Sequence, residues 1–257
     1  MIHLLWLSVT LMWRDRYPKK FFLITDIMTS LIDTIFYYFT SEAFGRAFGP
    51  ENYFQYVIWG EVVLALPMMM FLASTKALRG SLIEGTWEIL LTNPQSMTKI
   101  LWNLSLGDFL REAIRLMIVI LFSISLGAKF ATLLSAKAFF LVLFSVPLFW
   151  NLGLIGAALF IYTGRGLGAT QHLRQLATIF AGVYFPLTVF PSWLAQLSLL
   201  ISPWTWLVEA SRQDSFNFFN IAGVFGISIM FIFVGPWFLK IALRELSRSG
   251  RRLTFLN

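Results

Sequence analysis

Residues 138–162 read AFFLVLFSVPLFWNLGLIGAALFIY, a stretch of 25 residues without a charged side chain. A helix of this length would measure about 37 Å at about 1.5 Å per residue, enough to cross the roughly 30 Å hydrocarbon core of a bilayer. In lipid only a helix or a closed barrel pairs all of its backbone polar groups, and barrel strands alternate apolar with polar residues. This stretch does not alternate, so it predicts a membrane-spanning helix.

The rest of the chain has the same character. Of its 257 residues, 58% are hydrophobic, 17% aromatic and only 13% charged, whereas an ordinary soluble domain has about 25% charged residues. We therefore predict an all-α integral membrane protein with six transmembrane helices. The predicted spans are residues 21–40, 53–75, 109–128, 138–162, 176–190 and 216–239. The fifth run has 15 residues and as a helix would be only about 22 Å long.

The segments outside these spans are shorter and more polar. Residues 1–18 carry two tryptophans in an apolar stretch bordered by basic residues, which predicts an N-terminal interfacial helix on the cytoplasmic surface. A polar turn is expected at 41–52 and a return loop at 163–175, while 76–103 is expected to be a mixed, partly helical cytoplasmic loop. Because no repeat or soluble domain is visible, residues 1–257 are predicted to be one membrane domain.

The distribution of Lys and Arg predicts the orientation. With the N-terminus inside, sixteen of the 20 basic residues lie on the cytoplasmic side and four lie outside. By the positive-inside rule both termini are cytoplasmic, which predicts a multi-pass protein of the cell (inner) membrane. The net charge of +7 is dispersed between apolar runs instead of forming one patch, so membrane lipids are the expected surroundings and nucleic acid is not an expected partner.

Reactive side chains are scarce. The chain has no cysteine and only two histidines, His3 and His172, which is too few for a typical metal cluster. The phosphate-binding signature GxxxxGK[ST] is absent, and no Ser, His and Asp set lies at one predicted depth. We expect no catalytic residue, no metal and no cofactor on this chain, and a membrane-embedded enzyme is the less favoured interpretation.

One loop is informative. Residues 79–99 read RGSLIEGTWEILLTNPQSMTK, and their centre, 87–91, predicts a short amphipathic helix. Gly85 opens it, Glu88 complements the positive end of its dipole, and Asn93 with Pro94 ends it. Such a helix can lie flat at the cytoplasmic surface and present a polar face to a partner.

A second stretch near the C-terminal end is apolar but interrupted. Residues 185–213 read FPLTVFPSWLAQLSLLISPWTWLVEASRQ. Prolines and tryptophans at this density predict short interfacial or re-entrant helices on one membrane face, which we place at 190–215 on the external side. The candidate external gate region consists of Pro191, Trp193, Pro203 and Trp204. We interpret Trp193, Trp204 and Trp206 as anchors at the membrane interface.

Together these stretches resemble the type 2 permeases of ATP-binding cassette exporters. In the first loop the matching positions are Glu84, Gly85, Thr86, Glu88, Leu90, Leu91 and Pro94; in the second stretch they are Pro186, Pro191, Trp193, Leu194, Pro203 and Arg212. Six spans with both ends inside and an interfacial N-terminal helix extend the resemblance over nearly the whole chain. The large extracellular domain of some branches of this family is missing.

The resemblance implies a function and partners. It implies a permease that dimerises with itself or a paralogue, binds two nucleotide-binding ATPase subunits that hold ATP and Mg, and exports a substrate. An apolar, aromatic-rich pathway suits a lipid, drug or amphipathic peptide, while some members of the family export polysaccharide. It also implies that the loop helix contacts the ATPase subunit as a coupling helix. The expected contact residues are Glu84, Gly85, Thr86, Trp87, Glu88, Leu91 and Pro94.

Three acidic residues lie within predicted spans. Asp26 and Asp33 in the first span are seven positions apart and so share a helix face with Ser30, and Glu61 lies in the second span. An acid at the centre of a bilayer costs about 2.5 to 3.5 kcal/mol on insertion scales, so these residues should not face lipid. We take them as candidates for a substrate path, with neutralisation by protonation or by a basic partner as the alternative.

Charged residues in and near the predicted spans allow one alternative function and include one structural set. A stand-alone secondary transporter could use the same acids for proton coupling, although no inverted repeat or broken midplane helix is visible. The set Asp108, Arg111, Glu112 and Arg115 is interpreted as structural, because its (i, i+3) spacing pairs opposite charges.

Overall fold

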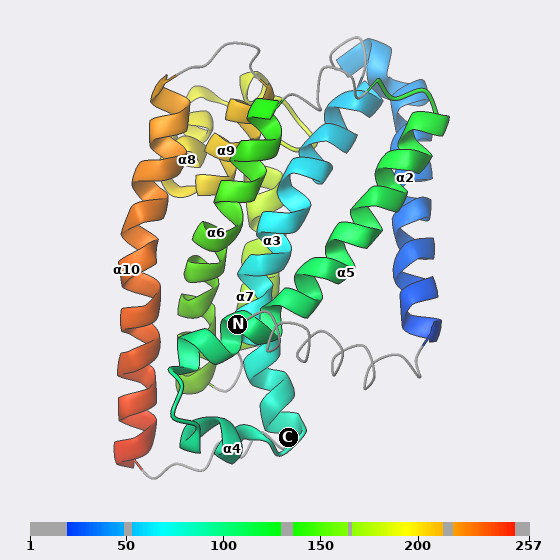
Figure 1. Ribbon diagram of the computed structural model, residues 1–257. Helices are drawn as coiled ribbons and strands as arrows, with labels where there is room; N and C mark the ends of the chain where they lie inside the picture. The colour runs from blue at the N-terminus through cyan, green and yellow to red at the C-terminus, as the bar shows by residue number, and fades with distance from the viewer. Residues whose placement is uncertain (1–19, 49–52, 130–135, 164–165, 213–217, 250–257) are drawn as a thin grey trace.

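The computed structural model describes residues 20–48, 53–129, 136–163, 166–212 and 218–249, and over these ranges all regular elements are helical (Figure 1). The prediction of an all-α protein is therefore confirmed. The elements are α2 (Lys20–Phe48), α3 (Tyr53–Ile83), α4 (Trp87–Thr92), α5 (Met97–Ser125), α6 (Ala136–Thr163), α7 (Gly166–Phe180), the 3-10 turn η2 (Leu187–Val189), α8 (Ser192–Ile201), α9 (Pro203–Arg212) and α10 (Phe218–Ser249).

Helix α3 is the centre of the bundle. It packs against α2, α5, α6, α7 and α9, while α10 packs on α6 and α9 at the far side. Figure 1 shows α2 and α10 at opposite edges, α4 at one end of the bundle, and α8 and α9 at the other. The central position of α3 agrees with its many buried apolar residues, because a helix surrounded by others buries most of its surface.

The close crossing of α3 and α6 depends on a small residue. A Cβ added at Gly153 of α6 would overlap the backbone carbonyl of Phe71 on α3. Gly235 of α10 approaches the backbone of Asn151 on α6 in the same way. Small residues that let two backbones approach are typical of helix packing in membranes, where apolar burial gives little drive for association.

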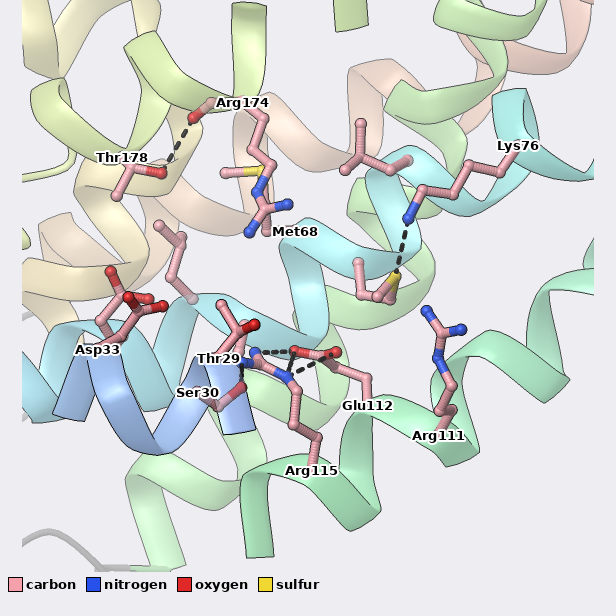
Figure 2. Close-up of a pocket in the computed structure, with 15 residues that line it drawn as sticks. Thr29, Ser30, Asp33, Met68, Lys76, Arg111, Glu112, Arg115, Arg174 and Thr178 are labelled. Atoms are coloured by element: carbon pink, nitrogen blue, oxygen red, sulfur yellow. Dashed lines mark hydrogen bonds and ion pairs between the residues drawn. The ribbon is translucent and has the colours of Figure 1, made fainter. Parts of the chain in front are cut away.

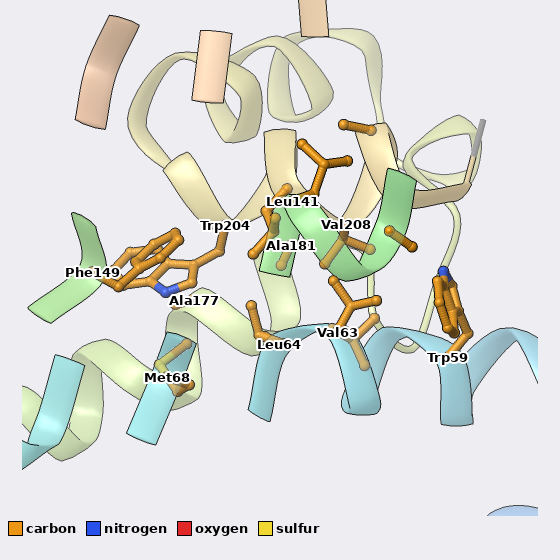
Figure 3. Packing of buried hydrophobic residues seen from close by; sticks show 14 of the residues in the cluster. Trp59, Val63, Leu64, Met68, Leu141, Phe149, Ala177, Ala181, Trp204 and Val208 are labelled. Carbon is orange, nitrogen blue, oxygen red and sulfur yellow. The ribbon is translucent and has the colours of Figure 1, made fainter. Parts of the chain in front are cut away.

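Aromatic and aliphatic side chains of α3, α6, α7 and α9 form the larger buried cluster, part of which Figure 3 shows. Trp204 lies within it, stacked on Phe149 at 5.3 Å between ring centroids and edge-on to Phe71 at 5.4 Å. Trp204 is only 8% exposed whereas Trp193 is 65% exposed. The interpretation of Trp204 as an interface anchor is therefore wrong, because its ring packs in the protein interior.

Several boundaries differ from the predicted ones. Helix α2 continues to Phe48, past the expected start of the polar turn at 41, and α5 begins at Met97 instead of 109. The cytoplasmic loop expected at 76–103 is correspondingly reduced to α4 and the short links beside it. Polar residues inside these helices suggested loops. However, most polar residues have helix propensities close to those of apolar residues, and only Gly and Pro strongly disfavour a helix.

The largest difference concerns the expected loop at 163–175. Residues 166–175 are instead the first part of α7, which ends at Phe180, so the fifth apolar run at 176–190 is not one helix. Thr170 and Ala177 are buried, two turns apart on one face, and α7 packs on α3 and α6. These contacts outweigh the unfavourable helix propensity of glycine in this segment.

Two helices in the described part of the chain are long and apolar enough to cross a membrane. They are Tyr53–Ile83 and Ala138–Thr163. Outward apolar side chains are also common, as in α6, where Phe139 is 63% exposed and Phe140 53% exposed. Such faces favour a membrane-embedded helical protein. The expected interfacial helix at 1–18 lies outside the described residues.

Candidate functional site

A polar cavity of about 320 Å³ lies between α2, α3, α5 and α7 (Figure 2). Seven charged side chains line it, four basic and three acidic. They are Asp33, Glu61, Lys76, Arg111, Glu112, Arg115 and Arg174. Charged groups at this density inside an otherwise apolar bundle mark the cavity as the candidate functional site, because they are costly to hold away from water.

Two of the acids selected from the sequence meet here. Asp33 and Glu61 line both this cavity and a smaller one of about 50 Å³ that continues it toward Tyr37. The two cavities also share Ser30 and Arg115. The side chain of Asp26 lies outside the described residues. The acids from two helices thus contribute to one polar space.

An ion pair within α5 lies at the wall of the cavity, and its arginine also donates a hydrogen bond to α2. The Arg115 guanidinium donates from Nε to both carboxylate oxygens of Glu112 at 3.1 Å, and from Nη2 to Oε1. Its Nη1 donates to Ser30 Oγ at 2.8 Å. The (i, i+3) pairing of Glu112 with Arg115 agrees with the structural interpretation made from the sequence. The sequence did not predict that this pair would line a cavity.

Two successive hydrogen bonds lie beside the smaller cavity and join Glu61, Tyr184 and Tyr37. The Tyr184 hydroxyl donates to Glu61 Oε1 at 2.8 Å, and the hydroxyls of Tyr184 and Tyr37 are 3.3 Å apart. Tyr184 lies in the turn that follows α7, so these hydrogen bonds link α2, α3 and this turn. Sequence reasoning missed both tyrosines, because a tyrosine in an apolar run carries no signal of its partner.

Three further basic residues point into the same space from different helices. Lys76 belongs to α3, Arg111 to α5 and Arg174 to α7, and all three line the larger cavity. The Lys76 ammonium lies 3.8 Å from the sulfur of Met69, which is a weak acceptor. From the sequence, Lys76 and Arg174 indicated only the orientation, and Arg111 was interpreted as a member of a structural set of charges on one helix. Their shared cavity could not be read from a count of positive charges.

One wall of the cavity is apolar. Leu64, Ala65, Met68, Met69 and Leu72 line it from α3. Their spacing of one, three, one and three residues places them on one face of a helix. The cavity therefore joins a charged region to an apolar strip.

The short helix predicted at 87–91 is present as α4, Trp87–Thr92. Gly85 has φ of +69°, a left-handed conformation that a side chain would strain, and the Thr86 amide donates to Ser81 O at 2.9 Å. Trp87 is 8% exposed and packs with Leu78 in the second buried cluster. The turn and the tryptophan together hold α4 against the ends of α3 and α5.

The other residues expected at the coupling contact are mostly at the surface of α4. Glu84, Gly85, Glu88, Leu91 and Pro94 are exposed, whereas Thr86 is half-buried and Trp87 buried. Trp87 therefore anchors the helix, and the outward face consists of acidic and aliphatic side chains.

The four residues of the expected external gate do not form one cluster of exposed side chains. Pro191 precedes α8 and Pro203 begins α9, so each proline sets the start of a short helix. Trp193 is exposed on α8, while Trp204 is buried. The proline pattern thus indicated the helix starts, but it did not indicate which tryptophan packs in the core.

Arg212 is the central polar residue at this end of the bundle. Its Nη1 donates to the Tyr56 hydroxyl at 2.6 Å and to Gly182 O at 2.7 Å, and its guanidinium lies 3.6 Å from the Tyr56 ring centroid. Gly182 has φ of +73°, so the turn presents this carbonyl from a backbone that favours glycine. Burial raises the pKa of the Glu209 carboxyl. The positive charge of Arg212, 4.0 Å away, lowers this pKa but offsets only part of the effect of burial.

Across the described residues no group of three or more His, Cys, Asp and Glu side chains is arranged to hold a metal ion. No family model matches the sequence, and no curated protein matches it.

Proposed function

We propose that this chain is the transmembrane subunit of an ATP-binding cassette exporter. It works as a dimer of permeases, with itself or a paralogue, and with two separate nucleotide-binding ATPase subunits that hold ATP and Mg. The observation that carries the proposal is the fixed position of α4 at one end of the bundle (Figure 1). An ATP-driven permease that lacks a phosphate-binding loop receives force from an ATPase partner, and a short helix transmits force only when its ends are held.

The surface of α4 supports a protein partner on that side. Ile89 is 66% exposed, Leu91 49% exposed, and the neighbouring Ile83 72% exposed, with Glu84 and Glu88 beside them. An apolar patch with polar residues around it is typical of a protein contact. The acidic residues disfavour the alternative that this patch rests on the anionic cytoplasmic leaflet.

We also propose the finer topology of six spans with both termini in the cytoplasm of a cell (inner) membrane protein. In this arrangement α2, α3, α5, α6 and α10 cross the membrane, and α7 crosses only partly before the chain turns into the external helices α8 and α9. The separation of α4 from α8 and α9 at opposite ends of the bundle supports it. Exposed apolar residues on α2, α5 and α10, such as Phe36, Leu121 and Phe233, support lipid contact for these helices.

The polar cavity is the proposed start of the substrate path. It is open, since Thr29, Asp33 and Arg174 on its wall are exposed. A site that combines charge with an apolar strip suits an amphipathic substrate such as a lipid, drug or peptide. A polymeric substrate such as a polysaccharide would use the seam between two permeases instead.

One observation favours a second candidate, a proton-coupled secondary transporter. Asp33 and Glu61 line one cavity, and Glu61 accepts a hydrogen bond from Tyr184. Carboxyl groups that line a cavity in a membrane bundle can carry protons during transport. In this alternative α4 has no motor to contact, and a proton gradient drives the substrate.

Reconstitution separates the two candidates. The chain would be co-expressed with each P-loop ATPase encoded in an adjacent reading frame, purified and placed in liposomes, with association, ATP hydrolysis and efflux measured on one preparation. If the chain is an exporter subunit, we expect association, ATP hydrolysis and efflux only when both subunits are present. Sustained active transport by the chain alone would contradict it, and transport that follows an imposed proton gradient would support the second candidate.

A further inference from the structure

The basic residues of the cavity outnumber the acids that neutralise them. Glu112 is engaged by Arg115, and Glu61 accepts a hydrogen bond from Tyr184. Lys76 and Arg174 form no ion pair within the described part of the chain. Lys76 is half-buried, and Asp108 and Glu112 attract it without forming a direct ion pair, so the cost of its desolvation is only partly offset. An anion that enters the cavity would offset this cost.

The charges are also separated in space. Figure 2 places Asp33 at one side of the cavity and Lys76 with Arg111 at the other, with the Arg115 and Glu112 pair between them. Arg174 reaches into the cavity from α7. An anion bound near Lys76 therefore lies away from Asp33, which reduces the repulsion between the anion and the Asp33 carboxylate.

The apolar strip of α3 ends at the basic residues. It runs from Leu64 to Leu72, and Lys76 follows one turn later on the same face. A ligand with an acidic head near Lys76 can lay its apolar part along this strip. Inorganic phosphate would leave the strip unused.

The size and opening of the cavity restrict what it can take. Its volume of about 320 Å³ is at the lower end of the range of about 300 to 1,000 Å³ for small-molecule sites. It therefore has room for a head group and the first part of a chain but not for a whole diacyl lipid. The exposed Arg174 and Thr29 on its wall show that it opens outward, so the remaining tail can stay in the bilayer.

We propose that this cavity binds an amphiphilic anion, whose phosphate or carboxylate head contacts Lys76 and Arg174 and whose tail lies along the half-buried Ala65 and Met69 of the strip. If the chain is the exporter proposed above, amphiphilic anions are its substrate class. Only the export of the bound ligand rests on that proposed function. Binding itself needs no ATPase subunit.

The test measures binding to the purified chain in a neutral maltoside detergent. The probe is a fluorescent short-chain phosphatidic acid, followed by anisotropy, with phosphatidylcholine of the same chain length and inorganic phosphate as competitors. We expect phosphatidic acid to bind most tightly. A charge-assisted contact should be worth about tenfold in affinity, or about 1.4 kcal/mol, so Lys76→Gln and Arg174→Gln should each weaken binding about tenfold.

Matched substitutions serve as controls. Arg79→Gln and Lys99→Gln remove the same charges from exposed side chains that do not line the cavity, and they should leave the affinity within about twofold, because long-range charge effects are weak in high dielectric. Arg174 is exposed, so Arg174→Gln tests the site without disturbing the buried core. Elution volume and thermal unfolding verify that each variant is folded.

Three results would overturn the proposal. They are equal binding of phosphatidylcholine, displacement by inorganic phosphate at the same concentrations as by the amphiphile, and equal losses in the cavity and control variants. Failure of the exporter function would look different, since the chain would bind the probe normally and yet never associate with an ATPase subunit.

Discussion

The hydroxyl of Tyr184 donates a 2.8 Å hydrogen bond to the carboxylate of Glu61, and this bond ties the turn after α7 to the first third of α3. We expect Tyr184→Phe to lower the free energy of unfolding by about 1 to 3 kcal/mol, because it leaves a carboxylate oxygen without its donor. Thermal unfolding in detergent measures the loss. Tyr162→Phe is the control, since Tyr162 is 46% exposed. Equal stability of the two variants would show that Glu61 does not depend on this donor.

Arg212 should be difficult to replace even by lysine. Its fork donates to Tyr56 and Gly182 together, and its plane lies over the Tyr56 ring. Lysine keeps the charge but lacks the planar fork, so Arg212→Lys should destabilise the chain by about 2 kcal/mol or more. Arg248→Lys, on an exposed residue of α10, should change the melting temperature little. An unchanged melting temperature for Arg212→Lys would exclude the fork as the support of this end.

The close crossing of α3 and α6 predicts a strong position effect for alanine. Gly153→Ala places a methyl group against the Phe71 carbonyl and should cost about 1 to 3 kcal/mol. Gly80→Ala puts the same methyl group where nothing lies within 4 Å and should be neutral or stabilising by about 0.4 to 1 kcal/mol. Melting temperatures of the two variants in one detergent test this, and a more stable Gly153→Ala would contradict the packing argument.

The exposed face of α4 predicts the effect of charge reversal. Glu88→Lys should reduce association with the ATPase subunit or uncouple ATP hydrolysis from efflux, while the chain stays folded, because Glu88 is exposed. Glu245→Lys, on an exposed residue of α10, should leave all three measurements normal. If Glu88→Lys also gives normal values, Glu88 is not at the contact and acts only on the helix dipole, worth about 0.3 to 1 kcal/mol. Replacing residues 85–94 by a flexible linker without effect would remove the coupling role.

Asp33 lies on the wall shared by the two cavities. We expect Asp33→Asn to reduce transport more than folding or assembly, because Asp33 is exposed and lines the cavity. Efflux rate, elution volume and melting temperature on the same preparation give the comparison. Normal efflux would make Asp33 a tolerated acid. Loss of proton-driven uptake instead of ATP-driven efflux would support the secondary transporter.

Features that depend on residues close together in the sequence could be predicted from the sequence alone. The charge-free run at 138–162 predicted α6, and Gly85 with Pro94 predicted the limits within which α4 lies. Helix formation and helix ends depend on propensity, caps and turn residues within a few positions, so their signals are local. The number of membrane crossings stays a prediction, since two candidate spans occur among the described residues.

Only the tertiary structure decided which polar groups meet. Lys76 and Arg174 are 98 positions apart and served in the sequence only as signs of orientation, yet they line one cavity. Glu61 with Tyr184, and Trp204 with Phe149 in the apolar core, are also in contact although they are far apart in the sequence. Sequence periodicity shows which residues share a face of one helix, but the face that each helix turns to its neighbours is set by packing. In this bundle that choice depends on close backbone approaches such as Gly153 against Phe71, and no pattern within a single helix encodes both partners.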